Sequence, residues 1–170
     1  MPFEIVLVIM LLTIAATALL FAAHQDVKSR VISNQFNVFF LGLSVIILVI
    51  SYLSNLLSAS DLFSHVTTGL ILLIICFAGF GLGLMGGGDA KLIPSVAMLA
   101  GGHLVPLFLI FTAIAGGLLA LMMMTFTRLV GQQSTNLMMN KVPYAVAIAV
   151  GGIMIIIRLI LNIVTGGSYA

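Results

Sequence analysis

Long apolar runs separated by short polar stretches dominate the chain. Four runs have about the 20 residues that a membrane-spanning helix needs, and they cover residues 3–23, 36–57, 62–84 and 143–164. Hydrophobic residues follow one another without alternation, which favours helices over the strands of a transmembrane barrel. We therefore expect an all-α polytopic membrane protein.

The part of the chain between Lys91 and Arg128 carries no charge. It is too long for one span and short for two spans with a loop. If both bases lie on the cytoplasmic side, as basic loop residues usually do, an even number of crossings separates them. We therefore predict a short fourth helix over 89–100, a turn at 101–103 and a fifth helix over 104–127. The total is six helices in one domain covering 1–170, with both termini on the non-cytoplasmic side.

Composition supports a membrane location and narrows the partners. The chain is 62% hydrophobic and 6% charged, whereas a soluble domain has about 25% charged residues. The net charge of +2 comes from scattered groups, as expected for basic residues that orient a chain in the membrane. It gives no reason to expect a nucleic-acid partner. A lone cysteine, Cys76, excludes an internal disulfide and a cysteine metal site.

Two acids stand at the predicted cytoplasmic edge, Asp26 after the first helix and Asp89 at the start of the fourth. Three glycines, Gly86, Gly87 and Gly88, precede Asp89 and would let another backbone approach it. Two carboxylates that share a site do not both ionise cheaply, so one can activate water while the other donates a proton. Because a helix N-terminus favours an anion, we expect the shared proton mainly on Asp26.

Other interpretations of these acids stay open. Each acid alone fits a helix cap or an ion pair, Asp26 with Arg30 and Asp89 with Lys91. Together they also fit a small transporter or channel subunit that binds a proton or cation. A membrane scaffold in which neither acid matters is a third hypothesis. The three histidines fall on different sides or segments, which argues against a histidine metal centre, and Glu4 is expected, like Asp61, to be a solvated loop acid.

Three segments, 26–34, 86–91 and 142–149, together resemble the type IV prepilin peptidases, intramembrane aspartyl proteases of the GxGD type. The closest resemblance is to short members that serve tight-adherence pili. The resemblance implies that Asp26 and Asp89 are catalytic. It also matches Gly86 and Gly88 to the motif glycines, and Lys91 to the base after the motif.

The first of these segments ends in Asn34, as the family's motif does, but Ser33 stands where the family usually has proline. We expect this difference to loosen the turn into the second helix. The family's longer members carry a cysteine-bearing insertion after the first span, and the short polar loop 24–35 has none. We therefore predict no zinc and no other cofactor, and leave N-methylation open.

The resemblance further implies an endopeptidase that removes a short basic leader from pilin and pseudopilin precursors, on the cytoplasmic side of a bacterial inner membrane. Its partners would be these precursors and membrane lipid, with the oligomeric state undetermined. Five bases would form an inner rim, and we expect one or two to contact an acid of the precursor: Lys28, Arg30, Lys91, Arg128 and Lys141.

Overall fold

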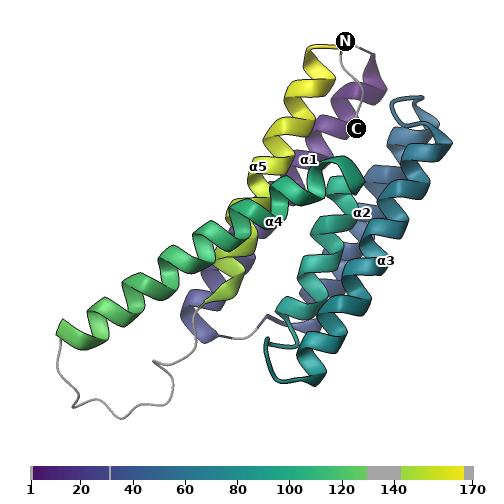
Figure 1. Cartoon of the computed structure of the whole chain (residues 1–170). Helices are drawn as coiled ribbons and strands as arrows, with labels where there is room; N and C mark the ends of the chain where they lie inside the picture. The colour runs from purple at the N-terminus through teal and green to yellow at the C-terminus, as the bar shows by residue number, and fades with distance from the viewer. Residues whose placement is uncertain (1, 31, 130–142, 167–170) are drawn as a thin grey trace.

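The computed structural model describes residues 2–30, 32–129 and 143–166, and the described part is helical with no strand. All five helices are long and apolar enough to cross a membrane. They are α1 (Phe3–Ser29), α2 (Asn34–Leu53), α3 (Ala59–Gly81), α4 (Asp89–Leu129) and α5 (Tyr144–Val164). The start of α1 and the end of α5 lie at one end of the bundle (Figure 1).

The predicted count of six helices is wrong, because the fourth and fifth form one element, α4. This element breaks at Gly101, whose φ of 69° and ψ of 174° are not helical. Figure 1 shows the first arm of α4, residues 89–100, rising beside α3, and the second arm turning back and diverging from it. A single glycine makes the turn for which a three-residue loop was expected, since glycine tolerates positive φ.

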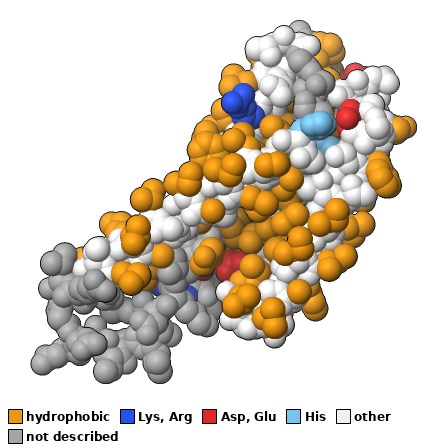
Figure 2. Space-filling model, viewed as in Figure 1, with side chains coloured by type: hydrophobic (Ala, Val, Ile, Leu, Met, Phe, Trp, Pro, Cys, Tyr) orange, Lys and Arg blue, Asp and Glu red, His pale blue; other side chains and the backbone are white. Residues whose placement is uncertain are grey.

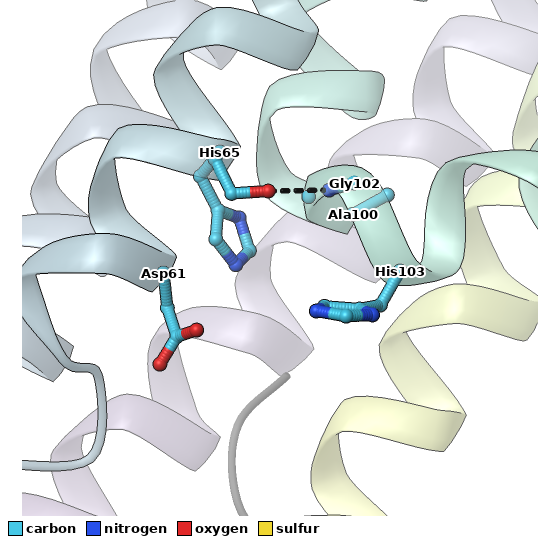
Figure 3. A pocket seen from close by; sticks show the side chains of 7 residues that line it. Asp61, His65, Ala100, Gly102 and His103 are labelled. Carbon is cyan, nitrogen blue, oxygen red and sulfur yellow. Dashed lines mark hydrogen bonds between the residues drawn. The ribbon is translucent and has the colours of Figure 1, made fainter.

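Side chains of α3 bind the backbone on both sides of this break, at the end of the first arm and at the start of the second. The ring nitrogen Nδ1 of His65 hydrogen-bonds with the carbonyl oxygen of Met98 at 2.8 Å, at the end of the first arm. The N–H of Gly102, at the start of the second arm, donates to Ser64 Oγ at 3.3 Å (Figure 3). These contacts satisfy backbone groups that a helix end leaves without partners.

The break also gathers polar residues that the sequence pattern had separated. Asp61 and His65 of α3 and His103 of α4 surround a small pocket (Figure 3). Asp61 is not a loop acid as expected, because it lies in the first turn of α3 and forms a capping box with Ser58. Glu4 likewise lies in the first turn of α1. Within the described ranges, no three metal-ligating side chains are placed to hold an ion.

The polar stretch 24–35, expected as a loop, is partly helical. Helix α1 continues to Ser29, so that Asp26 lies in its last turn, and Arg30 ends it in the left-handed conformation with φ of 55°. Ser33 then caps α2 by accepting a hydrogen bond from the N–H of Phe36 at 3.2 Å. The serine that was expected to loosen this turn therefore supplies a helix cap instead.

Glycines let α5 pack closely against α1 and α4. A Cβ at Gly152 would lie 2.6 Å from a methyl of Leu19 in α1 and 3.1 Å from one of Val96 in the first arm. A Cβ at Gly151 would lie 2.8 Å from the carbonyl oxygen of Phe108 in the second arm. Small residues allow such close approach between membrane helices. Helix α5 is thereby fixed with its N-terminus near the last turn of α1.

Candidate functional site

Asp26 links the first helix to the last. Its side chain is only 6% exposed, and its Oδ2 accepts a hydrogen bond from the backbone N–H of Ala145 at 2.9 Å. Ala145 belongs to the first turn of α5, whose own N-cap, Pro143, offers no side-chain hydrogen bond. Asp26 thus supplies an acceptor to an N–H that lacks an intrahelical partner. A carboxylate at a helix N-terminus is also favoured by the helix dipole.

Asp89 lies close enough to Asp26 for the two carboxyl groups to interact electrostatically. It is the first residue of α4 and is half-buried. Figure 2 shows acidic surface in a hollow among apolar side chains, at the end of the molecule where α4 begins. The two acids, far apart in sequence, therefore lie at the same end of the helix bundle. Placing an acid in such apolar surroundings costs free energy, so an acid found there marks a candidate functional site.

The expected position of the shared proton was based on helix polarity. That expectation placed Asp26 beyond the C-terminus of a helix and Asp89 at an N-terminus. In the structure both acids lie at helix N-termini, because Asp26 also faces the start of α5. Asp26 thus lies at the C-terminus of α1 and at the N-terminus of α5, so its contrast in helix polarity with Asp89 is smaller than expected, and the position of the shared proton stays a prediction.

The glycine segment before Asp89 packs against the link between α1 and α2. A Cβ at Gly88 would lie 2.9 Å from Cβ of Ile32, and the Gly88 carbonyl accepts a hydrogen bond from Asn37 Nδ2 at 3.3 Å. No side chain fits at Gly88 without displacing Ile32 or the segment itself. This contact brings the residues that follow Asp26 against the residues that precede Asp89.

The other two glycines differ in their surroundings. A Cβ at Gly86 would lie 3.1 Å from Oδ2 of Asp89, so the absence of a side chain keeps the carboxylate approachable from that direction. A Cβ at Gly87 would lie 3.2 Å from the ring of Phe80. Gly87 and Gly88 therefore accommodate neighbouring side chains, and Gly86 is the glycine that adjoins the acid.

The start of α2 holds the start of α4 through two amides. Lys91 Nζ donates to Asn34 Oδ1 at 2.7 Å, while Asn37 binds the Gly88 carbonyl. Asn34 and Asn37 are three residues apart, so they lie on the same face of α2. Sequence reasoning singled out Asn34 but missed Asn37. The available signal was a third amide, one turn into a mostly apolar helix.

The predicted basic rim is described only in part. Lys28 is exposed in the last turn of α1. Arg30 acts on Asp26 through its charge, and its Nη1 is buried without a hydrogen-bond partner. The ammonium of Lys91 binds Asn34, and not Asp89 as an ion pair would require. Arg128 lies in the last turn of α4, and Lys141 lies outside the described residues.

These features define a multi-pass helical membrane protein with two interacting acids at one end of its bundle. The type IV leader peptidase family matches residues 5–121, a segment that includes both acids and the glycines. The chain belongs to this family and is a type IV leader peptidase-like protease. Neither a curated protein nor a solved structure matched it.

Proposed function

We propose that the protein is an intramembrane aspartyl endopeptidase. In this proposal Asp26 and Asp89 hydrolyse the bond between a short basic leader and the hydrophobic helix of a pilin or pseudopilin precursor. The observation that carries the proposal is that both acids lie at one end of the bundle, where the glycine before Asp89 packs against Ile32, in the segment that follows Asp26. The two carboxyl groups are near enough for their charges to influence each other. Membership of a leader peptidase family supports the same reaction class.

The pair supplies both proton transfers of an aspartyl protease. One carboxylate takes a proton from water as the oxygen attacks the scissile carbonyl carbon. The other, protonated at the outset, donates to the carbonyl oxygen. When the tetrahedral intermediate collapses, the C–N bond breaks, the departing amine receives a proton from the protonated acid, and a hydroxyl of the intermediate returns its proton to the other carboxylate. Electrostatic interaction between the two groups favours this singly protonated state.

The cytoplasmic face of a bacterial inner membrane is the location we infer for the site. Lys28, Arg30 and Lys91 all lie at the end of the bundle that carries the acids. Positive residues favour the cytoplasmic side. A precursor with a basic leader would keep that leader on the same side, with its hydrophobic helix in the membrane.

Co-expression with a pilin precursor tests the proposal directly. The leader-free product should appear with the wild-type chain and disappear with Asp26→Asn and with Asp89→Asn. Glu4→Gln is the matched control, because Glu4 is an exposed acid at the opposite end of α1. Cleavage that persists in either aspartate variant, at wild-type rate and equal protein level, would exclude an aspartyl dyad. A proton or cation carrier would yield no leader-free product with any variant.

A further inference from the structure

A groove with a volume of about 380 Å³ lies between α2 and α3, with the first arm of α4 as its floor. Helices α2 and α3 make few direct contacts with each other, which leaves the groove between them. Its lining is almost entirely apolar away from one end. The apolar lining includes Val38, Leu41, Val66, Leu70, Leu73 and Met98.

One end of the groove is polar and positively charged. Lys91 and Asn34 line it, joined by the bond from Lys91 Nζ to Asn34 Oδ1. Because an ammonium can only donate, the amide oxygen of Asn34 must face Lys91, and the NH₂ group of Asn34 remains a further donor at this end. The amide is neutral, so the contact leaves the positive charge of Lys91 uncompensated. This end of the groove is suited to an anion.

The groove lies on the opposite side of the first arm from Asp89. At 3.6 residues per turn, Lys91 is rotated by about 200° from Asp89 around the helix axis, and Met98 by about 180°. Both residues line the groove. A chain held there is separated from the acid by the backbone of the arm itself. The groove therefore does not present a peptide bond to Asp26 and Asp89.

We propose that this groove binds one anionic phospholipid. An acyl chain occupies the apolar part between α2 and α3, and the phosphate accepts hydrogen bonds from Lys91 Nζ and the Asn34 amide. Basic pockets between membrane helices on the cytoplasmic side commonly bind anionic headgroups. The lysine stem follows the apolar wall while its ammonium reaches the headgroup. The lipid would brace α2 and α3 against the arm that begins with Asp89.

Native mass spectrometry of the purified full-length chain tests this proposal independently of cleavage. The delipidated protein is incubated with phosphatidylglycerol or with phosphatidylcholine of the same acyl chains, and retained lipid is measured. The wild-type chain should retain one phosphatidylglycerol in preference to phosphatidylcholine. Lys91→Gln should weaken that retention about tenfold, as expected for one lost charge-assisted hydrogen bond. Lys91→Arg should keep it, and Lys28→Gln, which changes an exposed base outside the groove, should resemble wild type.

A second pair of variants tests the acyl part. Leu70→Phe narrows the groove and should reduce retention of both lipids, whereas Ile74→Phe, one turn further along α3 and outside the lining, should not. Circular dichroism confirms that each variant is folded. Equal retention by wild type, Lys91→Gln and Leu70→Phe would overturn the proposal. Displacement of the lipid by a precursor peptide would also overturn it, because the groove would then belong to the substrate.

Discussion

The backbone N–H of Ala145 donates a hydrogen bond to the carboxylate of Asp26 at 2.9 Å, joining the first helix to the last. Asp26 therefore has a structural role at the start of α5 whatever its chemistry. An aspartate that both caps a helix and hydrolyses a peptide would respond differently to different substitutions. This difference allows the two roles to be measured separately.

Asp26→Asn should preserve the fold and abolish cleavage. The asparagine oxygen can still accept from Ala145, whereas the amide cannot transfer a proton, and we expect activity to fall by at least about a hundredfold. Asp26→Ala removes the acceptor as well and should lower stability by about 1–3 kcal/mol, the cost of an unsatisfied buried N–H. Thermal melting in detergent would measure this difference. If the two variants melt at the same temperature, the bond to Ala145 does not stabilise α5.

Gly88→Ala should impair both stability and cleavage. The added Cβ would lie 2.9 Å from Cβ of Ile32, a buried and β-branched residue that has little freedom to move. Relief of this contact would push the glycine segment away from α1, with a stability loss of about 1–3 kcal/mol and a wider separation of the two acids. Melting temperature and cleavage rate should therefore fall together.

The control for this substitution is Gly81→Ala. Gly81 ends α3, and a Cβ there would meet nothing within 4 Å. The substitution should be neutral or slightly stabilising, since alanine favours helix more than glycine does. If Gly88→Ala behaved like this control, close packing between Gly88 and Ile32 would not be needed to position Asp89.

Some of the site could be predicted because charge pattern determines membrane topology. Two apolar spans, 36–57 and 62–84, separate Asp26 from Asp89, and two crossings return the chain to the side on which it started. The basic residues beside each acid agree with this placement of both acids at the same end of the bundle. The helix count failed at Gly101, since one glycine with positive φ can reverse a helix without a loop. Apolar pattern alone does not distinguish such a break from a short connection.

The contacts around the acids could not be predicted, because they depend on how distant helices are placed. The bond from Ala145 to Asp26 requires α5 to begin at the depth where α1 ends, and hydropathy fixes that depth only to within several residues. The missing N-cap at Pro143 was a signal that another part of the chain must satisfy α5. Similarly, the interaction of Asn37 with Gly88 depends on the rotation of α2, which a helix with only a few scattered polar residues does not reveal.

His65→Ala should weaken the break in α4. His65 hydrogen-bonds the Met98 carbonyl, and its ring fills the space beside Gly101. Its loss leaves a helix end unsatisfied and a cavity, with an expected cost of about 2–4 kcal/mol. Cleavage should fall less than it does in the aspartate variants, because this end of the arm is remote from Asp89.

His103→Ala is the control, since His103 is an exposed side chain at the same break. We expect its effect to lie within about 0.5 kcal/mol. Unfolding in detergent, followed by circular dichroism, compares the two variants. Equal melting temperatures for His65→Ala and wild type would show that the turn at Gly101 holds without its histidine.

Asn37→Leu should separate stability from activity. Asn37 is 4% exposed, and while its Nδ2 donates to Gly88, its Oδ1 is buried without a partner. Leucine has a similar shape and removes both the hydrogen bond and the unsatisfied oxygen, so the net change in stability should be within about 1 kcal/mol. The glycine segment would nevertheless lose its tether to α2, and Asp89 would be less well positioned against Asp26. We expect cleavage to fall about tenfold or more at nearly constant melting temperature.

The control is Ser44→Ala, which removes a buried hydrogen bond internal to α2 and should leave cleavage unchanged. Wild-type cleavage by Asn37→Leu would mean that α2 does not position the glycine segment for catalysis.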